Sequence, residues 1–468
     1  MPGAAPYHRA PVWLFPPTRS CRARALLASV AVVASLAGCR PTSEKIQRWK
    51  ETEAGPRKLA AAVADAELAL PLRGEAALAL IEIRELEALV EAVRGTSPAA
   101  QGALMTALAQ TLLARLEGSA APAARPTAIE AKDALFALRE WIPAAARGLA
   151  DEGLIRWLVA DWVGRSAGDH SGAKIARAIG GAAAPVLAEG LRRAEAGVAV
   201  VFAQLLRELG SGADRERAAA LLIERLRERD GLAREAGYQA LAALASPLGR
   251  SHLLAAAQSG ATSDRVLALL ALAKAPAVAS LPALGALAGG PRIPAAVREA
   301  AFTALEAVAA PATADVLAAI LARDADEKVR YRAVEALVAC CGAAGAERLL
   351  AALPPGYSYR RLDVSDFVER DLKDIGAAVV PVLRRALASP SWIARVIAVR
   401  VLGELGSEAD VAALRTLLTD QTPLRGWQGG DAASRAGGAT VAAEARAAIE
   451  RLGAARHEPG HEPGREPR

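Results

Sequence analysis

The sequence predicts an all-α fold, an α-solenoid (superhelix) of stacked helical pairs that recur about every 32 residues. Two observations lead to this prediction. The 468-residue chain is 53% hydrophobic but only 4% aromatic, and a composition rich in alanine and leucine favours close-packed helices over strands. In addition, an arginine followed by small apolar residues recurs at a nearly constant interval, which is typical of repeat architectures.

The chain opens with a segment that has the features of an export signal. An uncharged apolar run of fourteen residues, Ala25–Gly38, follows Arg19, Arg22 and Arg24. It is shorter than the roughly 20 apolar residues that a membrane-spanning helix needs, and its basic flank is typical of a secretory signal peptide.

The apolar run ends in Leu36-Ala37-Gly38-Cys39, which resembles the lipobox of bacterial lipoproteins. The resemblance implies that residues 1–38 are cleaved and that Cys39 becomes lipidated, with residues 39–58 serving as the tether. It also implies a lipid-anchored protein of the bacterial cell envelope. Arg40, in place of an aspartate, favours the outer membrane. A chance cysteine after an uncleaved apolar segment is the alternative.

The balance of charge argues against a nucleic-acid partner. Four of the 57 basic residues are arginines within residues 1–38, which contain no acid, so 53 basic and 51 acidic residues follow. A chain this long with so small a positive excess lacks the electrostatic footprint of DNA or RNA binding.

The recurring motif consists of an arginine at position i, a small residue at i+3, alanine or valine at i+6 and leucine at i+7. These positions lie along one helix face. A helical pair with such a face must stack on its neighbours to bury it, which produces a solenoid. Successive arginines from Arg234 are 31, 33, 32 and 65 residues apart, so one copy is skipped near residue 365. The six arginines are Arg73, Arg234, Arg265, Arg298, Arg330 and Arg395.

These repeats resemble HEAT repeats, most clearly the short type also found in phycobilisome lyases. The segment Trp392–Asp420 carries the resemblance, as does Val329-Arg330 with Asp324 and Asp326 ahead of it. The resemblance implies that the arginines pair with aspartates across the turns between repeats. They would then be structural rather than ligand-binding. It also implies capping repeats over 59–118 and a solenoid over 128–455. The stretch 119–127, rich in alanine and proline, is predicted to be a linker, and 456–468, which repeats His-Glu-Pro-Gly and lacks core-forming residues, is predicted to be a disordered tail.

Signals for catalysis are few. Gly164-Arg165-Ser166-Ala167-Gly168 fits the G-x-S-x-G motif of hydrolases, but the residues before it have helical spacing and the motif needs a strand there. Cys340 and Cys341 are adjacent, and neighbouring side chains on a helix point apart. We therefore expect two unlinked packing residues there, with a redox or metal role as the alternative. No cofactor and no metal site are expected.

Two departures from the repeat are candidates for binding a partner. The first, 354–374, concentrates tyrosines and arginines, which interfaces favour. The second, 420–440, lengthens the gap between two helices. An irregular surface loop without a role is the alternative for each. The candidate partner-binding residues are Tyr357, Tyr359, Arg360, Arg361, Arg425 and Trp427.

Together these features predict a non-catalytic, membrane-tethered scaffold or adaptor that binds an unidentified protein partner through its repeat surface. The first alternative is an enzyme on the same fold, similar to a bilin lyase or a DNA glycosylase. The second is a purely structural spacer in the cell envelope.

Overall fold

The computed structural model describes residues 40–118, 125–165, 170–228, 232–323, 326–353, 364–424 and 440–454. Their regular secondary structure is helical, and the β structure among them is one isolated bridge between Pro423 and Thr440. The predicted all-α class is confirmed. Within these ranges, no helix combines the length and hydropathy needed to cross a membrane. Contacts divide the chain into two units, up to Trp157 and from Leu158 on.

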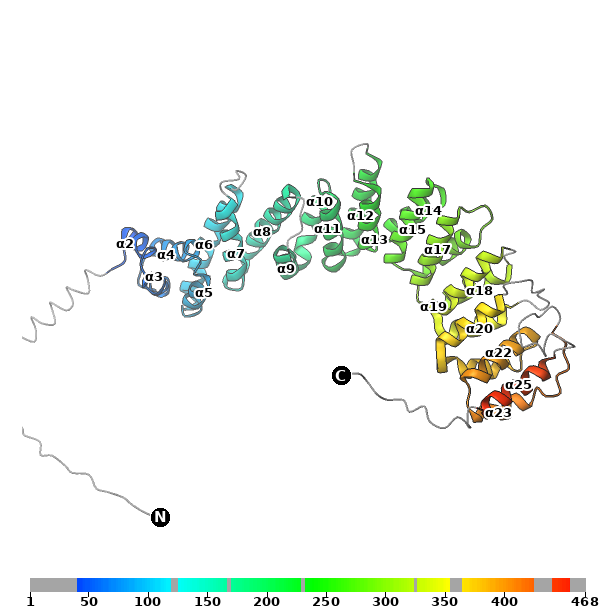
Figure 1. Ribbon diagram of the computed structural model, residues 1–468. Helices are drawn as coiled ribbons and strands as arrows, with labels where there is room; N and C mark the ends of the chain where they lie inside the picture. Colours follow the sequence, from blue (N-terminus) through cyan, green and yellow to red (C-terminus); the bar gives the residue numbers. More distant parts are fainter. Residues whose placement is uncertain are drawn as a thin grey trace, which may run out of the picture. The chain divides into compact units, whose positions relative to one another are not determined.

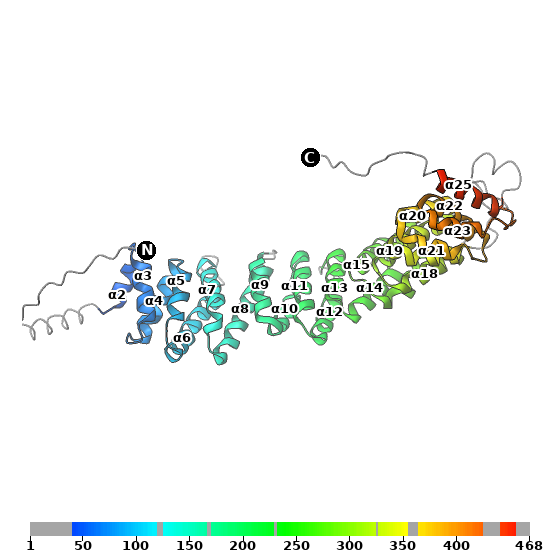
Figure 2. The ribbon, with the colours of Figure 1, turned by 90° about the horizontal axis from the view of Figure 1, so that it is seen from below.

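In the first unit, helices pack on others that are close along the chain, at most three helices away (Figures 1 and 2). For example, α4 contacts α3, α5 and α6, while α7 contacts α4, α5 and α6. Contacts of this local kind define a solenoid. The helices are α2 (Ser43–Trp49), α3 (Gly55–Ala64), α4 (Leu70–Glu82), α5 (Leu86–Arg94), α6 (Pro98–Glu117), α7 (Arg125–Leu138) and η3 (Arg139–Trp141), followed by α8 (Ala144–Arg165), which crosses the boundary.

In the second unit, one layer consists of helices that each contact the next member of the layer. The helix α20 takes the place of the skipped copy of the motif, between α19 and α22. The stacked helical pairs confirm the predicted α-solenoid. The layer comprises α9 (His170–Ile179), α11 (Ala196–Leu209), α13 (Arg234–Leu244), α15 (Thr262–Lys274), α17 (Ala295–Ala307), α19 (Glu327–Ala352), α20 (Val364–Ile375), α22 (Trp392–Leu405) and α25 (Val441–Ala454).

The second helix of each pair forms the other layer. Contacts such as α10 with α12, α12 with α14 and α16 with α18 run along this layer, parallel to those of the first. Its members are α10 (Ala184–Gly190), α12 (Gly212–Arg227), α14 (Pro247–Ser259), α16 (Leu281–Ala288), α18 (Pro311–Arg323), α21 (Val380–Ala386) and α23 (Glu408–Arg415), with short 3-10 turns η4 (Gly180–Ala183), η5 (Val278–Ser280) and η6 (Gly376–Val379).

The apolar positions of the recurring motif form the core between the helices. Its six leucines are all at most 3% exposed, and they are Leu80, Leu241, Leu272, Leu305, Leu337 and Leu402. The small residue at the third position allows close approach of the preceding helix. At Gly237, an added Cβ would lie 2.4 Å from the Leu226 side chain. The motif is therefore a packing motif.

Two joins with similar sequences also share a backbone conformation. Gly180 after α9 has a φ of 76°, and Gly376 after α20 has a φ of 70°. Left-handed backbone is accessible to glycine at little cost. In each case a 3-10 turn follows and a proline then stands in the first turn of the next helix. The two joins therefore end one helix and begin its partner in the same way.

Candidate functional site

The residues predicted to bind a partner lie outside the part of the chain that the structure describes. Tyr357, Tyr359, Arg360 and Arg361 fall within 354–363, and Arg425 and Trp427 fall within 425–439. The predicted lipidation site, Cys39, immediately precedes the first described residue. The predictions for these residues remain predictions.

The ends of the second of these segments are described, and they lie together. Pro423 and Thr440 form the isolated bridge. The amide of Val441 donates to the carbonyl of Thr422 (3.2 Å), and that of Ala442 donates to the carbonyl of Asp420 (2.9 Å). The residues on either side of the segment 425–439 are therefore hydrogen-bonded to each other.

Three of the recurring arginines bind main-chain carbonyls at the end of the preceding helix. Arg73 Nε donates to Val63 (2.9 Å), and Arg265 Nε donates to Ala257 (2.8 Å). Arg298 Nη2 donates to the carbonyl of Gly290 (3.1 Å), just beyond α16. The last carbonyls of a helix lack intrahelical partners and favour positive charge. These arginines therefore link the end of one helix to the start of the next.

Arg298 and Arg395 also pair with an aspartate of the following inter-repeat turn. Arg298 Nη1 lies 3.7 Å from Asp326 Oδ2, and Arg395 Nε lies 2.9 Å from Asp420 Oδ2. Arg395 also donates to the hydroxyl of Thr422 (3.2 Å). Burial would raise the pKa of Asp420, but hydrogen bonds from Thr422 and the charge of Arg395 outweigh it and hold the pKa below its ordinary value.

The remaining two recurring arginines are placed differently. Arg234 is exposed at the start of α13, and no hydrogen bond or ion pair joins its side chain to an acid among the described residues; its charge instead acts on His252. Arg330 is half-buried in the first turn of α19. Sequence position alone therefore does not give every copy of the motif the same bonds.

A second set of ion pairs joins residues that are one repeat apart, and sequence analysis missed it. Glu82 binds both Lys50 (3.0 Å) and Arg115 (2.9 Å), which are 32 and 33 residues away in the first unit. In the second unit Arg177 binds Glu208 at 2.7 Å, 31 residues on, and Lys373 binds Glu404 at 2.6 Å, also 31 residues on. An acid one period from a base is the sequence signal that would have found these pairs.

The most buried of these clusters are centred on Arg332 and Arg400. Arg332 binds Glu299 and Glu306 and lies 5.3 Å from the ring centre of Phe302. Arg400 is bound by Glu369 (3.2 Å) and Glu444 (3.0 Å) from the repeats on either side. Burial opposes the charge of both guanidinium groups, but the paired glutamates outweigh it and raise their pKa values. They hold adjacent repeats in register.

Two of the cavities within the described residues have charged side chains in their lining. In the first unit a cavity of about 480 Å³ lies between the α4–α5 turn and α7, with Arg84 and Glu130 at its rim 3.6 Å apart. In the second unit a cavity of about 650 Å³ is lined by the residues that follow α16 and by the end of α18. Its charged lining residues are Arg292, Arg298, Arg323 and Asp326.

The G-x-S-x-G sequence does not follow a strand. Gly164 and Arg165 are the last residues of α8, a helix of 22 residues, whereas Ser166–Gly168 lie outside the described ranges. A hydrolase nucleophile of this kind needs a strand directly before the serine. The segment that leads to Ser166 therefore has the wrong secondary structure for that motif.

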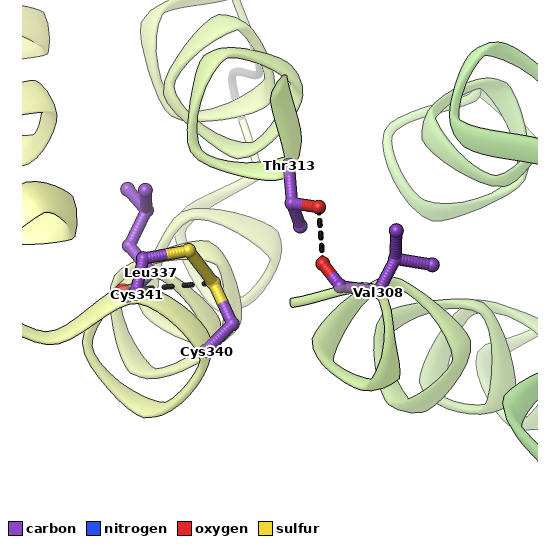
Figure 3. Close-up of a disulfide and its surroundings, with 5 residues drawn as sticks. All are labelled: Val308, Thr313, Leu337, Cys340 and Cys341. Carbon is purple, nitrogen blue, oxygen red and sulfur yellow. Dashed lines mark hydrogen bonds between the residues drawn. A yellow bond between two sulfur atoms is a disulfide. The ribbon is translucent and has the colours of Figure 1, made fainter. Parts of the chain in front are cut away.

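Cys340 and Cys341 form a disulfide (Figure 3), so the expectation that they are unlinked packing residues is wrong. Their Cα atoms are 3.8 Å apart. The expectation assumed a continuous helix, but Gly342 has φ 51° and ψ −128° and interrupts α19 directly after the pair. Because the regular helix ends here, the backbone does not force the two side chains apart. The nearby Thr313 hydroxyl donates to the carbonyl of Val308 in the preceding turn.

His252 is half-buried between charged neighbours. Burial, followed by the charges of Arg227 and Arg234, lowers its pKa. Its Nε2 atom is buried without a hydrogen-bond partner, and its ring centre lies 6.3 Å from that of Tyr238. Over the described ranges, no three histidine, cysteine, aspartate or glutamate side chains are grouped as metal ligands would be.

No protein-family model matches the chain, and no curated protein matches it. Among solved structures, human deoxyhypusine hydroxylase in complex with glycerol is 16% identical, with a TM-score of 0.20 over 65% of this chain and 98% of that one. Karyopherin Kap121p bound to the extreme C-terminus of the protein phosphatase Cdc14p is 13% identical, with a TM-score of 0.33 over 94% of this chain and 49% of that one. Kap121p bound to Ste12p is 14% identical, with the same TM-score. The chain thus spans about half the length of the karyopherin, and likeness at this level carries no inference about function.

Proposed function

We propose that this chain is a non-catalytic, membrane-tethered lipoprotein that acts as a protein–protein interaction scaffold through its HEAT-like repeat surface. The observation that carries the proposal is the set of ion pairs spaced by one repeat, such as Arg400 with Glu369 and Glu444. These pairs fix neighbouring repeats before any partner arrives. A preorganised surface loses less conformational entropy on binding than a flexible one.

The state of the buried acids supports a non-catalytic role. Asp410 is 1% exposed, and its pKa is lowered chiefly by the hydrogen bond from Arg384, with further bonds from Ser407. Asp151 is bound by Arg139 through two hydrogen bonds of 2.7 and 2.9 Å. Asp410, which Arg384 holds ionised, is a poor proton donor near neutral pH. These acids serve the fold.

The lipid anchor is supported by the sequence around Cys39 and by the short distance along the chain to the first helix. Helix α2 begins at Ser43, where the Thr42 side chain caps it by accepting from the amide of Lys45 (3.3 Å). Three residues therefore separate Cys39 from Ser43, the first residue of α2, and an extended chain spans at most about 3.6 Å per residue. A lipid on Cys39 would hold the first unit on the order of 10–15 Å from the membrane surface.

Lipidation is tested by labelling growing cells with an alkyne-palmitate and comparing the natural chain with Cys39→Ser. We expect a labelled chain in the membrane fraction and an unlabelled, released variant. Cys21→Ser is the matched control, because it removes a cysteine from the segment before the proposed cleavage site, and it should be labelled normally. An unlabelled natural chain would overturn the anchor.

The scaffold role is tested by photo-crosslinking in the same cells. A photoreactive phenylalanine at Tyr359 or Trp427 should yield a discrete adduct with another protein. The same group at Lys58, an exposed residue of α3, serves as the control. Adducts at no position would support the structural spacer instead. A chemical change in the captured partner that depends on one residue of this chain would support the enzyme alternative.

A further inference from the structure

The 650 Å³ cavity in the second unit has an unusual lining for a turn between repeats. Arginine side chains stand on its rim, from the connection after α16, the start of α17 and the end of α18. Beside them lie aliphatic groups of Ala286, Pro291 and Ile320. We call this site the three-arginine pocket, after Arg292, Arg298 and Arg323. Its volume is within the range of pockets that hold small ligands.

Among the described residues that line the pocket, three are arginines and one is an acid. Asp326 is the single acid in the lining; it lies 3.7 Å from Arg298 and also accepts from the amide of Lys328. Arg323 is exposed and uses its Nε to bind the carbonyl of Ala319 (3.0 Å). Arg292 is exposed and makes no polar contact with the described residues. Two guanidinium groups at the rim are thus available to an anion.

The backbone beside the pocket has two unusual features. Arg292 has a φ of 61°, in the left-handed region that residues other than glycine rarely adopt. Such a conformation is unfavourable for an arginine and persists only where its surroundings impose it. At Gly289 an added Cβ would approach Ile320 to 3.0 Å, so a glycine there lets α16 and α18 pack closely beneath the rim. In addition, Arg298 Nε is buried without a hydrogen-bond partner.

We propose that the three-arginine pocket binds an acidic segment of a partner polypeptide. A glutamate or aspartate side chain would pair with Arg292 and Arg323, and an aliphatic neighbour would contact Ile320 and Pro291. The mixed lining favours a peptide over inorganic phosphate, because a hydrated ion gains nothing from aliphatic groups, whereas a peptide buries apolar surface there. The proposal rests on the scaffold function and names the chemistry of the partner.

The test measures binding of a fluorescent hexapeptide of alternating glutamate and leucine to the purified chain from residue 40 on, by fluorescence anisotropy at two salt concentrations. A glutamine–leucine hexapeptide removes the charge and keeps the length. The variant Arg292→Gln/Arg323→Gln removes the rim charges but keeps Arg298, which binds Gly290. The control Arg193→Gln/Arg415→Gln removes two exposed arginines that do not line the pocket.

We expect the acidic peptide to bind, more weakly at higher salt, and the rim variant to lose about tenfold in affinity, the loss expected for one or two charge-assisted contacts. Arg292→Lys/Arg323→Lys should restore most of it, and the control variant should bind normally. Equal binding of the two peptides, equal binding by the rim variant, or no binding would overturn the proposal. If millimolar phosphate displaces the labelled peptide as effectively as unlabelled peptide does, the peptide proposal is also wrong and the pocket is a phosphate site.

Crosslinking in cells separates this proposal from the scaffold function. Suppose that the rim variant still forms the adduct at Tyr359 or Trp427 and binds the acidic peptide as tightly as the natural chain does. The scaffold function then stands, and the pocket is not part of it. If no adduct forms in the natural chain either, the scaffold function itself fails. Thermal unfolding of each variant checks that the charge changes leave the fold intact.

Discussion

Arg395 and Asp420 join the start of one repeat to the turn that begins the next, with Arg395 Nε 2.9 Å from Asp420 Oδ2. The two side chains are 14% and 18% exposed, so solvent screens the pair only in part. Arg395 also donates to the carbonyls of Ser389 (2.7 Å) and Pro390 (3.2 Å). A single guanidinium group thus ties together the loop before α22 and the base of the 425–439 segment.

Replacement of Asp420 by asparagine should destabilise the second unit by about 1–3 kcal/mol, because it leaves a largely buried arginine without its counter-charge. Denaturant unfolding measures the effect. Glu189→Gln is the matched control, because Glu189 pairs with Arg192 on the surface (67% and 53% exposed, respectively), and such pairs contribute about 0–1 kcal/mol. Equal losses in the two variants would contradict the role of the Arg395–Asp420 pair.

The Arg395–Asp420 pair should make the stability of the fold decrease in acid. The pKa of Asp420 is lowered in the folded chain, so its contribution is present above the unfolded pKa of about 3.9 and is lost as pH falls through the folded value. Stability measured between pH 6 and strong acid should therefore fall less steeply in Asp420→Asn than in the natural chain. Parallel pH profiles would show that Asp420 is not held ionised by the fold.

His252 should weaken the fold in mild acid. Its pKa is lowered in the folded state, so the unfolded chain takes up the proton first, and stability declines as pH falls below about 6.5. His252→Phe keeps a ring against Tyr238 and removes the titration. Melting temperatures from pH 8 to pH 5 should fall less for this variant. A natural chain with no loss of stability over that range would argue against the lowered pKa.

Gly237→Ala should cost about 1–3 kcal/mol, because the new Cβ would lie 2.4 Å from Leu226 Cδ2 and 2.9 Å from its Cγ in a packed interface. Gly197→Ala in α11 is the control, since an added Cβ there meets nothing within 4 Å. That change should be neutral or slightly stabilising. The measurement is the free energy of unfolding of each variant. Equal losses in Gly237→Ala and Gly197→Ala would contradict the close approach at Gly237.

Peptide mapping without reduction should recover the segment that contains Cys340 and Cys341 lighter by two hydrogen atoms, and resistant to alkylation until a thiol reductant is added. This follows from the bond between the two sulfur atoms. Doubly alkylated peptide from chains that were never reduced would show that the cysteines are free.

The sequence predicted the helical pairs and their period because both depend on local periodicity. The small residue and leucine that follow Arg298 are Ala301 and Leu305, and both are fully buried. The bonds of individual arginines could not be predicted in the same way. Arg234 and Arg298 occupy the same motif position, but only Arg298 finds an aspartate in the next turn.

The disulfide was missed for a similar reason. Side-chain geometry was judged from an ideal helix, whereas Gly342 has a positive φ that only the folded backbone reveals. The pocket was missed because Arg292, Arg298 and Arg323 come from two successive repeats and are not close in any one motif. The residues predicted to bind a partner were chosen where the repeat pattern fails. They lie outside the described ranges, so their prediction remains untested.

The ion pairs between repeats have a consequence for how such a chain can change in length. The bond between Lys373 and Glu404, for example, connects residues 31 apart in adjacent repeats. Gene duplication of one whole period supplies a new acid and a new base at the right spacing, and each finds its partner without any change elsewhere. Loss or gain of half a period leaves charged side chains without partners on both sides of the junction. Insertion or deletion of a whole repeat therefore disrupts fewer ion pairs than insertion or deletion of part of a repeat.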